Sequence, residues 1–333
     1  LAASVSALYN SNSIFADGSG KEADFAKTER MLTDEENREN VTYFLIVGVD
    51  KSTKLTDCIW LMCFDNKAHK INVLQIPRDT YVGEDSIAPH KINAVYESPK
   101  TVNWCGKCGK EATEDEIESG SHTVCGGKVE QRKRNNIDEL IHCINSRLSL
   151  PVDYYLLFDF EGFEKVVDAM GGVDLYLEEE LKIYPNKTDY ETLHAGQNHL
   201  DGATALTFMR NRKTYAEGDL GRVKAQRKLI KAMMEKVEKM SLTDMLNILM
   251  AAKGSFKTDM SLKDMRSFLA PLKKCDADAL YMFELPGENY WKKGRPSYYI
   301  CDEEKTAEAF NEYMLPYGRK MTAYNISFPE PNF

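Results

Sequence analysis

The stretch KINVLQIPRDTYV, residues 70–82, joins an apolar strand to a charged turn. Apolar side chains dominate its first half, which is typical of a strand that is covered on both faces. The run stops at Pro77, and Arg78 and Asp79 follow at once. In isolation this pattern indicates a salt-bridged turn. The rest of the chain decides whether the two charged side chains also serve a site.

Two further apolar strands precede this stretch, VTYFLIVGVD (41–50) and TDCIWLMCFD (56–65). A tight polar turn at 65–68 joins the second strand to the third, so these two should form an antiparallel hairpin. Residues 151–177 read as strand, helix and strand, and 218–240 as a long amphipathic helix. Helices and strands interleave, which predicts an α/β protein with a mixed central sheet.

Composition limits the classes of function. The chain has 333 residues, 43% of them hydrophobic, which is enough for a sizeable core. The net charge of -9 argues against a nucleic-acid partner. No run of eighteen apolar residues is present, so no membrane span is predicted. Residues 1–40 read as a linker that follows a removed signal or anchor.

Two aspartates should meet Arg78 at one edge of the sheet. The first strand ends at Asp50, and Asp57 lies at the start of the second strand, a short connection later. The second and third strands form a hairpin, so the start of one and the end of the other share an edge. We therefore expect Asp50, Asp57 and Arg78 to converge.

A second basic stretch, FMRNRKTYAEGDLGRVKAQR, covers residues 208–227. Arg210 and Arg212 would point the same way in an extended segment. Arg222 and Gln226 share a helix face near the helix start, where backbone N–H groups favour an anion. Asp219 could cap that helix. A solvated basic helix start is the alternative interpretation.

Together the two stretches describe a pyrophosphate site. Arginines gathered at one place repel one another unless an anion lies between them, and the guanidinium fork fits phosphate oxygens. Two aspartates at the same edge suit Mg²⁺ (or Mn²⁺), which commonly binds one or two carboxylates together with substrate phosphates.

The motifs FLIVGVD, TDCIWLM, VLQIPRDTYV, HKINAVY, HLDGATALTFMRNR and GDLGRVKAQR, taken in order, resemble the LytR-CpsA-Psr family. The resemblance implies an α-β-α sandwich with an apolar pocket for a lipid tail. It implies a catalytic domain at 41–318, with a cysteine-containing insertion at about 97–125 and a tail at 319–333. It also implies a membrane-anchored enzyme on the extracytoplasmic face of the cell membrane. Such an enzyme moves a glycopolymer, such as teichoic acid or capsule, from a polyprenyl-pyrophosphate carrier to peptidoglycan.

The resemblance also assigns roles to residues. Asp50 and Asp57 match the metal-binding aspartates of the family. The pyrophosphate-contacting set matches Arg78, Arg210, Arg212, Arg222 and Gln226. Arg78 and Arg222 are the candidate catalytic arginines, and Asp79 and Asp219 are the candidate general bases. This chain has Leu55 and Ala225 where the family often has arginine, which bears on donor specificity.

Two other functions remain open. A polyprenyl-pyrophosphate hydrolase would use water as the acceptor. A binding protein would hold a lipid-linked precursor without chemistry. The apolar side chains of the predicted helices fit a packed core as well as a lipid pocket: Val166, Val167, Ile230, Met233 and Met234.

The insertion carries its own cluster of possible ligands. Cys105 and Cys108 form one C-x-x-C pair, and His122 and Cys125 follow at the same spacing. Four such ligands would complete a tetrahedral structural zinc site. Disulfides are the alternative for a domain outside the cell. WCGKC also resembles a thioredoxin motif, but the strand-then-helix setting of that motif is missing.

Overall fold

The computed structural model describes residues 39–83, 91–107, 112–186, 188–211, 219–291, 293 and 297–329. All but the last two residues of the predicted linker at 1–40 lie outside this part of the chain. None of the helices in the described ranges is both long enough and apolar enough to cross a bilayer.

A six-stranded sheet forms the centre of the fold, with the strand order β11-β6-β1-β2-β3-β12. The strands are β1 (Val41–Val49), β2 (Thr56–Asp65), β3 (Lys70–Gln75), β6 (Tyr154–Asp159), β11 (Phe256–Thr258) and β12 (Tyr281–Glu284). β1 and β2 are antiparallel from the pair Val41 and Asp65 to the pair Val49 and Thr56, with one irregularity next to Gly48. The predicted α/β class with a mixed central sheet is confirmed.

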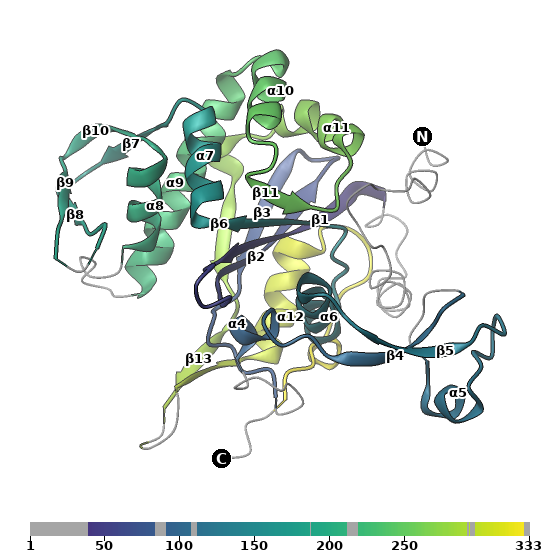
Figure 1. Ribbon diagram of the computed structural model, residues 1–333. Helices are drawn as coiled ribbons and strands as arrows, with labels where there is room; N and C mark the ends of the chain where they lie inside the picture. Colours follow the sequence, from purple (N-terminus) through teal and green to yellow (C-terminus); the bar gives the residue numbers. More distant parts are fainter. Residues whose placement is uncertain are drawn as a thin grey trace. The chain divides into compact units, whose positions relative to one another are not determined.

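The chain divides into two compact units, each described here by itself. Unit 1 comprises residues 1–67, 72–155 and 283–333, and unit 2 comprises 68–71 and 156–282. Figure 1 shows the elements along the chain.

Unit 1 packs helices and a small hairpin with the central strands. Its elements outside the sheet are α4 (Ile92–Val95), α6 (Asn136–Leu148), β13 (Gly287–Tyr290), β14 (Tyr298–Cys301) and α12 (Glu303–Ala309), which a π-helical segment (Phe310–Met314) continues. Fully buried side chains of the unit include Leu45, Leu61, Leu140 and Phe310. The Tyr43 hydroxyl donates to the Met314 carbonyl at 2.6 Å, which ties the first strand to the end of the π-helical segment.

A separate lobe of unit 1 contains the insertion. Its hairpin strands are β4 (Thr101–Cys105) and β5 (Val129–Lys133), and α5 (Glu114–Ser119) lies between them in sequence. Figure 1 shows the three elements projecting from the part of unit 1 around α6. β5 lies after residue 125, where the insertion was expected to end, so the lobe continues to Lys133. The capping box of Thr113 and Glu116 starts α5, and Gly120, at φ +69°, ends it.

Unit 2 is built around two packed helices and a two-stranded sheet. Its elements are α7 (Phe160–Ala169), β7 (Val173–Leu177), β8 (Leu181–Ile183), β9 (Glu191–Leu193), β10 (Gly196–Leu200), α8 (Gly202–Arg210), α9 (Asp219–Lys239), α10 (Leu242–Ala251) and α11 (Leu262–Lys273). Gly171 and Gly172, both at positive φ, follow α7 and permit the turn into β7. Asp201 caps α8 by accepting from the Thr204 amide.

Candidate functional site

An ion pair joins the turn after β3 to the start of β2. The Arg78 NH1 atom lies 2.7 Å from Asp57 Oδ1, and the two side chains remain 37% and 30% exposed. The predicted convergence of Arg78 with Asp57 is therefore confirmed, and the charges face solvent at the end of a core strand. A substrate anion can reach such a half-exposed guanidinium.

Two more charges extend this pair into a row of alternating sign. Asp79 Oδ2 lies 3.9 Å from Arg78 Nε, and Lys91 Nζ lies 2.7 Å from Asp79 Oδ1. Lys91 is not among the residues predicted from the sequence, where its only signal is its place in HKINAVY, twelve residues after Asp79. We call Asp57, Arg78, Asp79 and Lys91 the charged row. Its opposite charges hold the cations in place without a bound anion.

Backbone hydrogen bonds fix the turn that carries this row. The Asn93 amide donates to the Arg78 carbonyl at 3.2 Å, and the Tyr299 amide donates to the Asp79 carbonyl at 2.9 Å. The Tyr81 amide in turn donates a hydrogen bond to the Tyr299 carbonyl at 2.9 Å. Because helix α4 and strand β14 both hold this backbone, the Arg78 and Asp79 side chains start from a rigid mount.

Tyr299 also stabilises this mount through its side chain. Its hydroxyl donates to the Leu285 carbonyl at 2.6 Å inside unit 1. Burial, with a smaller contribution from Glu284, raises the pKa of Tyr299 above its usual range. The phenol therefore stays protonated and remains a donor over the physiological pH range.

Asp50 lies at the same end of the β1–β2 hairpin as Asp57. Its Oδ1 accepts from the Ser52 amide at 2.8 Å and from the Ser52 hydroxyl at 2.6 Å. The Asp50 amide donates to the Leu55 carbonyl, which closes the hairpin loop. Carboxylate oxygens at one hairpin end are the donor type that Mg²⁺ prefers, with substrate phosphates supplying further ligands. These oxygens are of the type that fits the implied metal, Asp57 Oδ1 is paired with Arg78, and the metal site itself stays a prediction.

Arg210 does not lie in an extended segment, so this prediction is wrong. It is the last residue of α8, and its guanidinium carbon lies 3.8 Å from the centre of the Phe160 ring. Stacking on an aromatic face orients the guanidinium while leaving its edge available to an anion. Arg212 lies outside the described residues, so the directions of the Arg210 and Arg212 side chains are not compared.

The long helix predicted at 218–240 is present as α9, with Arg222 and Gln226 one turn apart. The Gln226 Nε2 atom donates to the Met209 carbonyl at 3.2 Å, so this amide links α9 to the end of α8. Asp219 is the first residue of α9, and its side chain lies outside the described part of the structure. The predicted roles of Arg222, Gln226 and Asp219 toward a substrate stay predictions.

Ala225 is 4% exposed and belongs to the buried core of unit 2 with Val167 and Leu229. This position explains one departure from the family pattern, because an arginine there would place its charge in an apolar core. Of the residues proposed for a lipid pocket, Val167 lies in the same core and Met233 packs against it. The lipid pocket itself stays a prediction.

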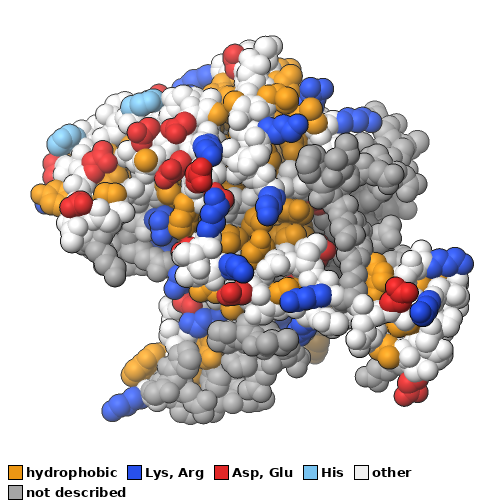
Figure 2. Space-filling model, in the orientation of Figure 1, with side chains coloured by type: hydrophobic (Ala, Val, Ile, Leu, Met, Phe, Trp, Pro, Cys, Tyr) orange, Lys and Arg blue, Asp and Glu red, His pale blue; other side chains and the backbone are white. Residues whose placement is uncertain are grey.

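The surface carries charges of both signs. Figure 2 shows Lys and Arg side chains interspersed with Asp and Glu on the face it presents. The chain as a whole carries a net charge of -9, so attraction of an anion depends on where individual cations lie.

Comparison with known proteins gives one consistent result. Residues 6–314 match the LytR_cpsA_psr family. Polyisoprenyl-teichoic acid--peptidoglycan teichoic acid transferase TagU of Bacillus mycoides is 28% identical over 253 residues, which are 72% of this chain and 77% of TagU. The transferase of the same description called TagV, from Bacillus subtilis, is 27% identical over 209 residues, which are 59% of this chain and 44% of TagV.

Solved structures share the fold. The crystal structure of Bacillus subtilis TagV aligns with a TM-score of 0.61 at 22% identity, over 84% of this chain and 99% of that one. A structure of TagT bound to LI-WTA aligns with a TM-score of 0.57 at 21% identity, over 83% of this chain and 90% of that one.

Proposed function

The chain belongs to the LytR_cpsA_psr family, and from this membership we propose that it transfers a glycopolymer from a polyprenyl-pyrophosphate carrier to peptidoglycan. The names of the TagU and TagV relatives support the substrate class. The observation that carries the proposal is the charged row, which mounts Arg78 at a strand end between two carboxylates. We place this activity on the extracytoplasmic face of the cell membrane, where peptidoglycan is the acceptor.

The proposed reaction is a phosphoryl transfer. A peptidoglycan hydroxyl oxygen forms a bond to the phosphorus that carries the glycan, and the hydroxyl proton passes to a base, for which Asp219 is the candidate. The bond from this phosphorus to the bridging oxygen breaks, and polyprenyl phosphate leaves with the electron pair. Because charge develops on the phosphate oxygens and on the leaving group, a positioned cation stabilises the transition state more than the ground state.

In this proposal Arg78 binds the pyrophosphate directly. The rigid turn removes most of the cost of orienting its guanidinium, and its half-exposed side chain can exchange contact with Asp57 for contact with phosphate oxygens. Lys91 adds a second cation next to it. Both Asp79 oxygens face these cations, so we assign Asp79 to their positioning rather than to proton abstraction.

Asp50 and Asp57 would hold Mg²⁺, which supplies charge neutralisation at the phosphates when it is bound. Arg210, Arg212, Arg222 and Gln226 are proposed to contact the same substrate, on the strength of the family pattern. Asp219 remains the candidate base.

A transfer assay separates this function from its two rivals. Polyprenyl-pyrophosphate-linked glycan, labelled in the sugar, is incubated with the protein and Mg²⁺, with and without peptidoglycan oligomers. A transferase forms a phosphodiester between the glycan and the oligomer, and it releases one polyprenyl phosphate for each phosphodiester formed. Equal release with and without oligomer would instead establish a hydrolase. Binding without release under both conditions would leave a binding protein and contradict the proposal.

A further inference from the structure

The described residues of the insertion lobe form no apolar core of their own. Among the residues of 101–133 whose burial is described, the buried ones are Cys105, Glu116, His122 and Gly127. Two of its aliphatic side chains, Ile117 and Val124, are 40% and 82% exposed, and Val102 and Val129 are only partly buried. A lobe of this size cannot be held by the hydrophobic effect alone, and such small units usually depend on a metal or on disulfides.

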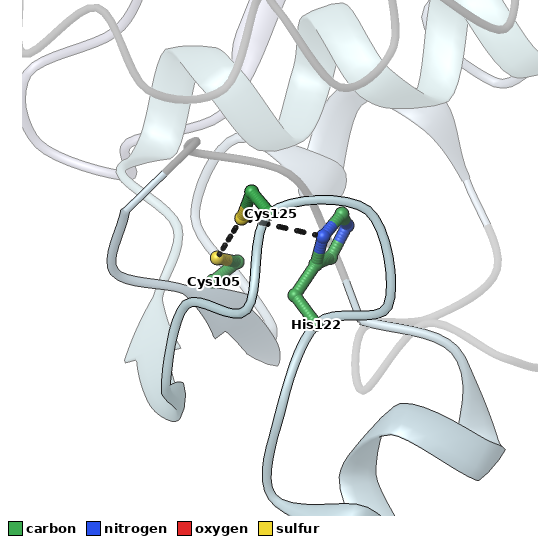
Figure 3. A group of neighbouring side chains, drawn as sticks. All are labelled: Cys105, His122 and Cys125. Carbon is green, nitrogen blue, oxygen red and sulfur yellow. Dashed lines mark hydrogen bonds between the residues drawn. The ribbon is translucent and has the colours of Figure 1, made fainter.

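The buried side chains of the lobe converge on one point. Figure 3 shows Cys105, at the end of β4, facing Cys125 and His122 from the loop that follows α5. The two sulfur atoms are 3.4 Å apart, and Cys125 Sγ is 3.5 Å from His122 Nδ1. One donor atom from each residue lies within 4.8 Å of the other two.

Two of the three separations are close to those in a tetrahedral zinc site. Zinc bonds of about 2.3 Å to sulfur and about 2.0 Å to nitrogen place ligand atoms about 3.5 to 3.8 Å apart at tetrahedral angles. The observed 3.4 and 3.5 Å are close to this range. A disulfide requires its sulfurs at about 2.05 Å, so the pair is positioned as two thiol ligands rather than as a bond.

The loop after α5 is shaped so that its donors point inward. The His122 amide donates to the Gly127 carbonyl at 2.8 Å, and the Gly126 amide donates to the His122 carbonyl at 2.8 Å. This closed turn places His122 and Cys125 on one side. A Cβ atom at Gly127 would lie 2.4 Å from Cys105 Sγ and 3.3 Å from Cys125 Sγ. Only glycine leaves room for the two sulfurs to approach.

A buried carboxylate orients the histidine from behind. His122 Nε2 lies 3.8 Å from Glu116 Oε1, and the two side chains are only 5% and 4% exposed. Glu116 is itself fixed by the amides of Thr113 and Thr123. A carboxylate behind the non-ligating nitrogen is the usual partner of a metal-bound histidine, because it directs the other nitrogen toward the metal.

We infer that Cys105, His122 and Cys125 bind a structural zinc ion that holds the insertion lobe together. Thiolate and imidazole ligands favour zinc over the hard cation expected near Asp50. Cys108, the fourth residue of the sequence-based prediction, lies outside the described residues, and the inference rests on the other three. It is independent of the transferase proposal, because none of these residues belongs to the charged row.

Metal content tests the inference directly. The full chain is purified from zinc-supplemented medium without a histidine tag, dialysed against metal-free buffer and measured by inductively coupled plasma mass spectrometry. We expect about one zinc per chain, as for a closed structural site, and its loss in Cys125→Ser and in His122→Ala. Cys301→Ser is the matched control, because Cys301 is a free thiol outside the lobe, and it should keep the zinc. Zinc-free wild type, or full zinc in both ligand variants, would overturn the inference.

Two further readouts separate zinc from a disulfide and from misfolding. Cobalt substitution should give sulfur-to-cobalt charge-transfer bands in the near ultraviolet that weaken in Cys125→Ser. Non-reducing peptide mapping should find Cys105 and Cys125 unlinked, and a linked peptide would overturn the inference. Limited proteolysis after chelation should cut the lobe within 101–133 while the rest of the chain resists, which shows that the loss of metal acts locally.

Discussion

Arg78 and Asp57 form an ion pair of 2.7 Å that links the end of β3 to the start of β2. Both side chains are about one-third exposed, so the pair adds about 1 kcal/mol or less to the stability of the fold. What the pair does provide is position. It holds a guanidinium at the end of a core strand, where the guanidinium can exchange its contact with Asp57 for contact with the proposed phosphate.

Asp57→Asn tests whether this carboxylate holds a metal as well as Arg78. The amide keeps the shape but removes the charge that attracts Mg²⁺, so the Mg²⁺ concentration for half-maximal release of polyprenyl phosphate should rise by about tenfold or more. A Mg²⁺ titration of the release rate measures this shift. Asp189→Asn, a change at an exposed loop residue, should leave the titration unchanged. A lower rate with an unchanged Mg²⁺ midpoint would limit Asp57 to the positioning of Arg78.

Lys91→Met removes one cation of the charged row and keeps an apolar stem next to the Tyr298 ring, over which Lys91 Nζ lies at 5.6 Å. Loss of a charge that favours the transition state should lower kcat by about ten- to a hundredfold. Lys91→Arg should recover part of the loss. Steady-state kinetics and a thermal melt give both readouts. A drop in Tm without a drop in kcat would assign Lys91 a structural role only.

Gly202→Ala tests the close packing of α7 and α8 in unit 2. The added Cβ would lie 2.3 Å from the Glu164 carbonyl oxygen, which belongs to helix backbone and cannot move freely. The free energy of unfolding should fall by about 1–3 kcal/mol, as for other overpacked sites. Urea denaturation measures the loss, with Ala203→Ser at the neighbouring exposed position as the control. Equal stability of the two variants would contradict the observed helix approach.

Gly127→Ala should release the metal from the insertion lobe, because its Cβ would meet Cys105 Sγ at 2.4 Å. Gly106→Ala is the matched control, since its Cβ would find only ordinary contacts, the nearest being Glu130 at 3.6 Å. We expect the zinc content of the first variant to fall several-fold and that of the second to stay at the wild-type level. Retention of zinc in Gly127→Ala would show that the sulfurs do not need this space.

The sequence predicted the central strands well, and the reason is local. β1, β2 and β3 are apolar runs bounded by polar turns, so their approximate bounds and the pairing of β2 with β3 could be read directly. Arg78 and Asp57 followed from that pairing alone. Lys91 could not be found in this way, because it reaches Asp79 through the tertiary bridge between Tyr81 and Lys91 rather than through a strand end.

The second basic stretch shows the limit of the same reasoning. Arg210 reads as part of an extended segment, yet α8 continues through it and Phe160 supplies a stacking partner fifty residues earlier in the chain. Ala225 stands where the family often has arginine, and the structure places it in the buried core of unit 2. Both outcomes depend on packing partners that local patterns do not contain.

The most direct test of the central claim is the release of polyprenyl phosphate from a synthetic polyprenyl-pyrophosphate-linked sugar. Wild type, Arg78→Ala, Arg78→Lys and the exposed-site control Arg266→Ala are compared with Mg²⁺ and with EDTA. We predict Mg²⁺-dependent release by wild type and the control. Arg78→Ala should lose about a hundredfold or more, with partial recovery in Arg78→Lys, because an ammonium cannot replace the bidentate fork. Undiminished release by folded Arg78→Ala would contradict the account.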